Sequence, residues 1–241
     1  MQFSVSIGRR FGCRQVEKHP NRKIEIIGIA ESTVFTLLAL LIAFTFSGAY
    51  ERFENRKLHI IDEANAFAKA YEYIDLLPAK YQPDMRVDIR KYLDLHLATY
   101  LDIPNMKKVF DDINQASIVQ HKIWKDVTAA GNTDPNSNII PLAITSMTNM
   151  FDAFHTGIEI AQVHPPRIIF ILLIGLSVLG GFLVGYSSAE NKHKFPIHTL
   201  CYVILTSFII YVIINLEYPR VGFIHLDAFD HILMTTRQEM N

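Results

Sequence analysis

Three long apolar segments dominate the pattern of hydrophobic and polar positions along the chain. Residues 168–189 carry no charged side chain, and neither do residues 196–216 when His198 is counted as neutral. A helix rises about 1.5 Å per residue, so each segment matches the roughly 30 Å hydrocarbon core of a bilayer. A third segment, residues 32–49, is just long enough to span. The pattern therefore predicts an integral membrane protein.

The polar stretches between these segments define the predicted organisation. We expect a basic cytoplasmic segment (1–23), a first transmembrane helix (24–49), a helical extramembrane domain (50–165), a second transmembrane helix (166–189), a short loop (190–195), a third transmembrane helix (196–216) and a C-terminal tail (217–241). The first span follows a basic leader and ends in small residues, as a cleaved signal peptide does. Its length favours an uncleaved membrane anchor instead.

Apolar residues at intervals of three and four predict four helices in the extramembrane domain. The first, over residues 51–77, continues the first span and is stopped by Pro78. The second follows residues 82–84 and ends near Pro104, and the fourth covers residues 140–162. The third covers residues 106–130, with six side chains expected to face inward: Val109, Phe110, Ile113, Ile123, Trp124 and Val127. No stretch alternates with period two for long, so the predicted fold is all-α.

Charge adds a predicted orientation and excludes one class of partner. The net charge of −1 argues against a nucleic-acid partner, which would require a basic surface. Lysines and arginines are more numerous before the first span than just after it, and two more, Lys192 and Lys194, lie in the loop between the last two spans. The positive-inside rule then places the N-terminus in the cytoplasm and the helical domain outside. We expect Cys13 and Cys201 to be two unpaired thiols.

The order of several motifs resembles the bacterial bestrophin-like family of unknown function. They are residues 37–47 (LLALLIAFTFS), 52–56 (RFENR), 63–66 (EANA), 75–78 (DLLP), 164–166 (HPP) and 216–224 (LEYPRVGFI). The resemblance covers roughly residues 30–235 and implies a multi-pass protein of the bacterial inner membrane that forms homo-oligomers. By analogy with bestrophins, which are pentameric anion channels, it also implies a cytoplasmic soluble part, opposite to the charge count.

The chain departs from this family pattern in two places. Members usually have an additional span before the basic segment, where this sequence begins. Tyr73 also stands where the family generally has arginine, which removes an anion-attracting side chain at that position.

Small and hydroxyl side chains on the first span are candidates for lining a pore. Thr36, Ala39, Ala43 and Ser47 follow steps of three and four, and Phe44 and Phe46 are candidate constrictions. The alternative is an ordinary seam between helices. On the second span Ser177, Gly181 and Gly185 are spaced four apart, which favours close helix packing in lipid.

Polar residues beyond the first span have two interpretations. Arg52 and Arg56 are an i,i+4 pair that could form a vestibule gathering anions. Alternatively, both arginines reach toward headgroups, while Glu63 and Asn65 form hydrogen bonds among the helices. The tail residues His225, Asp227, Asp230 and His231 are expected to be solvated.

No sequence pattern favours catalysis or a bound cofactor. There is no HExxH or other metal-ligand spacing, no glycine-rich phosphate loop and no nucleophile elbow. We therefore expect no enzyme, no metal and no cofactor. Two functional hypotheses follow: an oligomeric membrane protein that passes small anions, or a non-conducting membrane scaffold or sensor.

Overall fold

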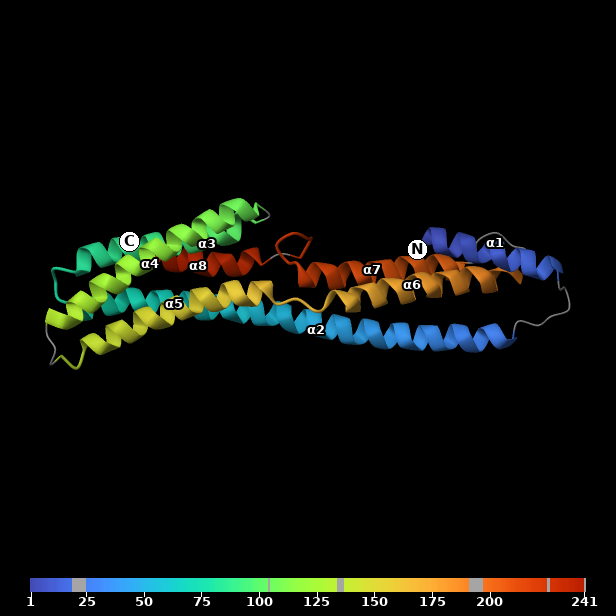
Figure 1. The fold of residues 1–241 in the computed structure, drawn as a ribbon, viewed down its shortest axis with the longest axis horizontal. Coiled ribbons are helices and arrows are strands. Elements are labelled where there is room, and N and C mark those ends of the chain that lie inside the picture. Colours follow the sequence, from blue (N-terminus) through green and yellow to red (C-terminus); the bar gives the residue numbers. More distant parts are fainter. Residues whose placement is uncertain (19–24, 104, 134–136, 191–196, 225, 241) are drawn as a thin grey trace. The chain divides into compact units, whose positions relative to one another are not determined.

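The computed structural model describes residues 1–18, 25–103, 105–133, 137–190, 197–224 and 226–240, and it is helical with no strand in these ranges (Figure 1). The elements are α1 (Gln2–Lys18), α2 (Glu25–Glu72), the short 3-10 helix η1 (Tyr73–Leu76), α3 (Gln82–Leu101), α4 (Met106–Thr133), α5 (Ile140–Gln162), α6 (Arg167–Ser187), the 3-10 helix η2 (Ser188–Glu190), α7 (Ile197–Glu217) and α8 (Asp227–Glu239). The predicted all-α class is confirmed.

The chain divides into two compact units that share the long helix α2. Unit 1 contains Met1–Arg52 and His164–Glu217, and unit 2 contains Phe53–Val163 and Tyr218–Asn241. Among the described residues, three helical stretches are long and apolar enough to cross a membrane, within Ile29–Leu76, Ile140–Ser187 and Thr199–Glu217. The first contains the apolar segment 32–49, and the other two overlap the apolar segments 168–189 and 196–216.

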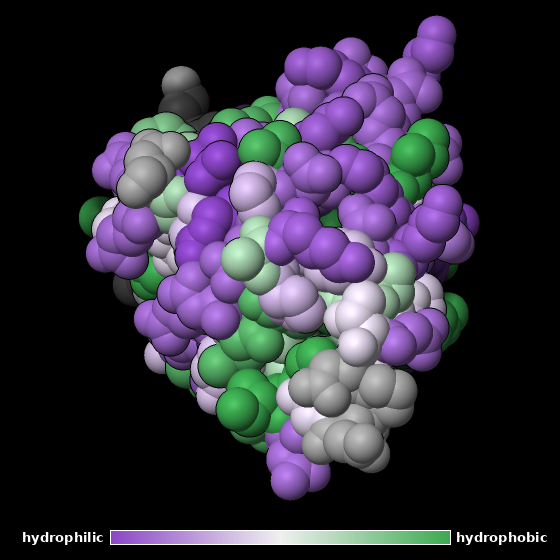
Figure 2. Space-filling model, turned by 90° about the vertical axis from the view of Figure 1, so that its left-hand side faces the viewer, coloured by the Kyte–Doolittle hydropathy of each residue, from purple (hydrophilic) through white to green (hydrophobic). Residues whose placement is uncertain are grey.

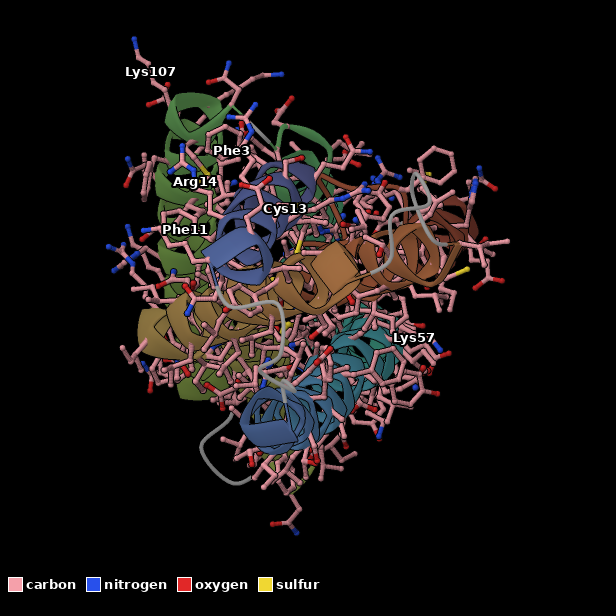
Figure 3. All side chains as sticks on the ribbon, turned by 90° about the vertical axis from the view of Figure 1, so that its right-hand side faces the viewer. Phe3, Phe11, Cys13, Arg14, Lys57 and Lys107 are labelled. Carbon is pink, nitrogen blue, oxygen red and sulfur yellow. The ribbon has the colours of Figure 1, made fainter. Side chains whose placement is uncertain are left out.

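In unit 1 the first residues form a helix that packs closely along α6. Ser4 Oγ donates a hydrogen bond to the carbonyl of Val178 at 2.5 Å. A Cβ at Gly8 would overlap the carbonyl of Phe182, and a Cβ at Gly185 would overlap that of Val5. The outer side of α1 carries Phe3, Phe11 and Arg14, all exposed (Figure 3). The segment expected to be a basic cytoplasmic extension therefore contains a helix bound to a membrane-type helix.

Unit 2 is a helical bundle around an aromatic and aliphatic core. Phe67, Tyr92, Met147, Phe154 and Leu233 come from α2, α3, α5 and α8 and are 0–1% exposed. The end of this unit that faces the viewer in Figure 2 is largely hydrophilic, with smaller hydrophobic patches between. Helix α2 ends before Pro78, as expected, and the bounds of α5 agree with the sequence prediction.

Two predictions about this unit are wrong. Phe110 and Trp124 on α4 are 59% and 45% exposed, because the buried stripe runs through Val109, Ala116, Val119, Ile123 and Val127. The two aromatic side chains lie one position away from that stripe. The prediction that the tail residues are solvated is wrong for Asp230, which is buried with Leu226 and Leu233 where α8 packs on α3. His231 is exposed, whereas His225 and the side chain of Asp227 lie outside the described residues.

Candidate functional site

The predicted pore-lining stripe lies on a face of α2 that its own chain leaves uncovered. Thr36, Ala39, Ala43 and Ser47 are all exposed, whereas Leu38 is only 3% exposed and packs inside unit 1. Only 6% of the apolar window of α2 is buried. Helical residues advance by about 100° each, so Leu38 and the stripe lie on opposite sides of α2. The candidate constriction residues Phe44 and Phe46, 68% and 42% exposed, flank the stripe.

Arg52 lies on the other side of α2 from Ala43 and binds Glu217 at the end of α7. Its Nε donates to both carboxylate oxygens at 3.2 and 3.0 Å, and its Nη2 donates to Oε2 at 2.8 Å. His164 Nδ1 donates to Oε1 of the same carboxylate at 2.9 Å. The Glu217 side chain is 0% exposed. Three segments of unit 1 therefore meet at one buried carboxylate.

A carboxylate at the C-terminal end of a helix is opposed by the negative end of the helix dipole. Glu217 is the last residue of α7, so burial and the dipole both disfavour its charge. The bidentate guanidinium of Arg52 offsets these costs with charge-assisted hydrogen bonds. Arg52 therefore has a structural partner in unit 1.

Arg56, the second vestibule candidate, is buried in unit 2. It is 7% exposed, and its Nη2 donates to the backbone carbonyl of Val163 at 3.2 Å. The remaining candidate on this helix, Asn65, is exposed.

Glu63 is the centre of a buried polar cluster in unit 2. His96 Nε2 donates to Oε2 of Glu63 at 3.0 Å, and the hydroxyl of Tyr100 donates to the two carboxylate oxygens at 2.8 and 2.9 Å. His59, one turn earlier on α2, places Nε2 3.1 Å from Oε1 of Glu63 and 2.9 Å from the carbonyl of Ala153. The cluster therefore joins α2, α3 and α5.

The cluster is closed from solvent by aromatic rings and by a glycine. The His96 ring lies 4.5 Å from the ring of Phe154 and 5.6 Å from that of Phe67. A Cβ at Gly157 would overlap Oε1 of Glu63, so α5 approaches closely enough only because this position has no side chain. In this structure the Glu63 carboxylate thus accepts hydrogen bonds from side chains of α3 beneath a close approach of α5.

The charges in this cluster are set by burial and by the histidines. Glu63 and His59 lie in unit 2, beyond the apolar part of α2. Burial by itself raises the pKa of Glu63, but the neighbouring His96 and His59 rings lower it to about 2. The hydrogen bond to Glu63 raises the pKa of His59, against the opposing effect of burial. The Glu63 carboxylate therefore favours the protonated form of His59 inside the bundle.

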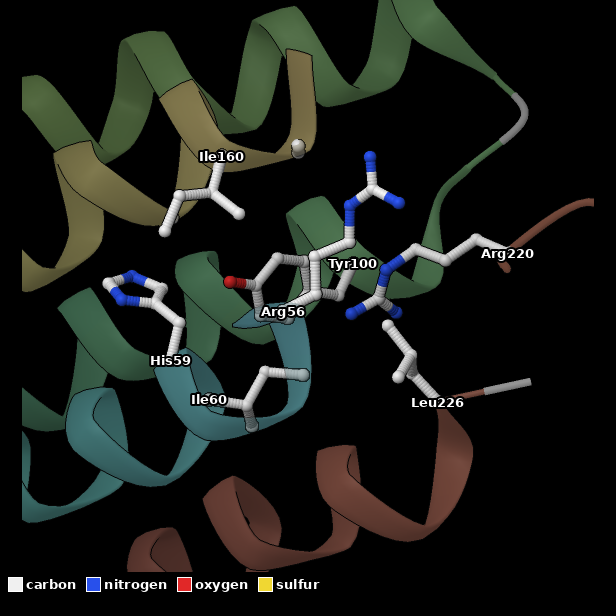
Figure 4. Close-up of a pocket in the computed structure, with 9 residues that line it drawn as sticks. Arg56, His59, Ile60, Tyr100, Ile160, Arg220 and Leu226 are labelled. Atoms are coloured by element: carbon white, nitrogen blue, oxygen red, sulfur yellow. The ribbon is translucent and has the colours of Figure 1, made fainter. Parts of the chain in front are cut away.

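A small cleft opens beside the cluster (Figure 4). It is lined by side chains of α2, α3 and α5 and of the C-terminal segment: Arg56, His59, Ile60, Tyr100, Gly157, Ile160, Ala161, Arg220 and Leu226. The Arg220 guanidinium lies 4.1 Å from the Tyr100 ring centroid and donates to Asp230 at 2.8 and 3.0 Å. The cavity volume is about 30 Å³.

The small residues of α6 contact the N-terminal helix. Ser177, Gly181 and Gly185 are buried, and Ser177 Oγ donates to the carbonyl of Leu173 at 2.6 Å. Gly181 and Gly185 lie against Val5 of α1. Within the described residues, no group of three or more His, Cys, Asp or Glu side chains is placed to hold a metal ion.

Several residues of these sites were not identified from the sequence. His59 lies one turn before Glu63, and this i,i+4 spacing was a usable signal. The contributions of His96 and Tyr100 depend on how α3 packs against α2, which no local pattern reveals. Glu217 and His164 belong to motifs of the family resemblance, but their pairing with Arg52 follows from the tertiary structure.

The chain was compared with solved structures, with curated proteins and with protein-family models. A crystal structure of a bacterial bestrophin homolog from Klebsiella pneumoniae matches with a TM-score of 0.68 and 12% identity, over 99% of this chain and 96% of that chain. A variant of that homolog matches with a TM-score of 0.71 and 10% identity, over 100% and 99% of the two chains. A crystal structure described as a membrane protein matches with a TM-score of 0.67 and 14% identity, over 99% and 97%. The search of curated proteins gives no match.

At such low identities the structural matches establish the fold alone. The family model of the bestrophin-like domain matches residues 5–227, which is most of the chain and includes α1. The chain therefore belongs to the bestrophin-like family.

Proposed function

We propose that this protein is an oligomeric membrane channel that passes small anions along the exposed face of α2. The observation that carries the proposal is the stripe Thr36, Ala39, Ala43 and Ser47, which lies opposite the face of α2 that packs within its own chain. A stripe of small and hydroxyl side chains presents little bulk and some hydrogen-bonding groups, as a channel lining requires. Copies of the chain arranged around this face would enclose a pore.

In this proposal Phe44 and Phe46 border the narrowest part of the pore. Arg52 and Arg56 contribute mainly by holding α2 in place, because each binds a group of its own unit, Glu217 in unit 1 and the carbonyl of Val163 in unit 2. The choice of anions rests on the resemblance to bestrophins. The alternative is a non-conducting scaffold or sensor, in which the exposed stripe is a seam between copies.

Ion flux into liposomes separates the two functions. We expect wild-type protein to admit halide faster than empty vesicles, and Ala43→Phe to abolish this flux by filling the stripe. Gly175→Phe is the matched control, because Gly175 is an exposed small residue on α6 with no heavy atom near its Cβ position. Flux of potassium instead of halide would overturn the anion assignment, and no flux above empty vesicles would favour the scaffold.

We also propose an orientation in the inner membrane, with the N-terminus in the cytoplasm and unit 2 outside. The support is the number of lysines and arginines before α2 and in the loop that contains Lys192 and Lys194. The resemblance to bestrophins implies the opposite side for unit 2.

Labelling in intact cells tests this orientation. In a Cys13→Ser, Cys201→Ser background, Asn138→Cys introduces one exposed thiol between α4 and α5. We expect a membrane-impermeant maleimide to label it in intact cells. Labelling only after lysis would place unit 2 in the cytoplasm.

A further inference from the structure

We propose that the cleft of unit 2 is a binding site for one small inorganic anion. This site is separate from the α2 stripe and does not depend on whether the chain conducts ions. The cleft is lined by residues from four segments of the chain: Arg56 and His59 on α2, Tyr100 on α3, Gly157 on α5, and Arg220 after α7 (Figure 4).

The chemistry of the lining favours an anion over a cation or a neutral molecule. Two guanidinium groups and one imidazole line the cleft, and none of its described lining residues is acidic. A guanidinium carries five N–H donors, so Arg220 has donors beyond the two that hold Asp230. The guanidinium and imidazole groups offer hydrogen-bond donors and positive charge to a ligand.

The two nearby carboxylates, those of Glu63 and Asp230, do not belong to the described residues that line the cleft. Glu63 is fully buried and bound by His96, Tyr100 and His59, and Asp230 is 3% exposed and bound by Arg220. With His59 protonated, the positive charges of His59, Arg56 and Arg220 exceed the negative charges of Glu63 and Asp230. His59 and Arg220 are thus held in position by buried carboxylates, and Arg56 by the carbonyl of Val163, and all three side chains line the cleft.

Size and surroundings restrict the ligand to a small ion. A cavity volume of about 30 Å³ holds a water-sized particle, whereas drug-sized ligand pockets span roughly 300–1,000 Å³. Ile60, Ile160 and Leu226 form apolar walls, which reduce the access of water and strengthen the electrostatic attraction. Chloride, bromide or another ion of similar size fits this description.

Thermal unfolding of the full-length protein in detergent tests the site. The probe is sodium bromide, titrated against sodium gluconate at constant ionic strength. We expect a saturable rise in the unfolding temperature with bromide, because a ligand that binds only the folded state stabilises it. Ala161→Leu, at an exposed residue that lines the cleft, should weaken the apparent bromide affinity at least about tenfold by filling the space.

The matched control is Gln162→Leu, which adds the same side chain to the next exposed residue of α5 outside the cleft and should keep the bromide effect. Anomalous diffraction from crystals grown in bromide provides a second measurement, with a peak expected within hydrogen-bonding distance of Arg56 or Arg220. An unfolding temperature that rises equally in gluconate, or a bromide effect that persists in Ala161→Leu, would overturn the site. A cleft without a bromide peak in those crystals would overturn it as well.

The outcome is distinguishable from that of the channel proposal. Loss of the bromide effect in Ala161→Leu, with no halide flux in wild-type protein, would keep the anion site and remove the channel. Halide flux that Ala43→Phe blocks, without any stabilisation of the wild-type protein by bromide, would keep the channel and remove the anion site.

Discussion

His59 is one turn from Glu63 on α2 and shares the buried carboxylate with His96. Because the pKa of His59 is higher in the folded than in the unfolded state, its stabilising effect is complete below the unfolded value of about 6.5. The effect is lost as the pH rises through the raised folded pKa. The unfolding temperature of the wild-type protein should therefore be higher than that of His59→Gln. This difference should become smaller as the pH rises from about 5.5 to about 9.

The measurement is thermal unfolding of both proteins in detergent across this pH range. In a Glu63→Gln background the same comparison should lose most of its pH dependence, because the carboxylate that raises the pKa of His59 is gone. A margin that is constant or grows toward high pH would show that His59 is not held as an imidazolium by Glu63.

Arg52 and Glu217 form an ion pair in unit 1 whose carboxylate is fully buried. Arg52→Gln removes the guanidinium from this carboxylate and leaves it with His164, so we expect a loss of about 3 kcal/mol in the free energy of unfolding. Arg52→Gln combined with Glu217→Gln should recover part of this loss, since no charge then remains buried. A double-mutant cycle on unfolding free energies measures the coupling.

An exposed ion pair supplies the control for this cycle. Lys108 binds Asp102 with a side chain that is 60% exposed, and Lys108→Gln should change stability little. Additive effects of the two unit 1 substitutions would mean that Arg52 and Glu217 do not depend on each other.

At the scale of elements, α6 contains two glycines with opposite surroundings. A Cβ at Gly185 would overlap the backbone of Val5 in α1, whereas Gly175 has no heavy atom within 4 Å of that position. Gly185→Ala should therefore destabilise the protein by about 1–3 kcal/mol through overpacking. Gly175→Ala should stabilise it by about 0.5–1 kcal/mol, because alanine is the better helix former.

Unfolding midpoints of the two variants in the same detergent give this comparison. The difference between two identical substitutions on one helix isolates the contact with α1 from the helix propensity of alanine. Equal effects at Gly185 and Gly175 would show that α1 does not pack against α6 in the membrane protein.

The helix positions on the chain follow from local signals. Pro78 ends the segment that contains α2, and the apolar periodicity of residues 140–162 reproduces the bounds of α5. The sequence alone does not decide which face of each helix is buried. Phe110 and Trp124 have the residue types of a core, but the packing of α4 buries a neighbouring stripe and leaves both exposed.

At the scale of the whole molecule, the exposed α2 stripe requires other copies of the chain if it lines a pore. We expect purified protein in detergent to have a single mass that is a multiple of the chain mass of 27.6 kDa, measured by native mass spectrometry. Ala43→Cys in a background without Cys13 and Cys201 should give covalent dimers on oxidation. A strictly monomeric particle would contradict an oligomeric pore.

The sequence by itself determined the membrane character, the all-α class, the limits of most helices and the family resemblance. These properties follow from hydrophobicity summed over segments of helical length and from turn residues such as proline, which act locally. The exposed stripe on α2 was likewise readable, because residues three and four apart share a face of any helix.

Only the tertiary structure decided which polar groups meet. The cluster around Glu63 requires α3 and α5 to lie beside α2, and the partner of Arg52 is a carboxylate more than a hundred residues away along the chain. The packing of α1 on α6 and of α8 on α3 was equally hidden. A buried charge is tolerated only where distant groups complete its hydrogen bonds, and that completion is a property of the folded chain and not of any local pattern.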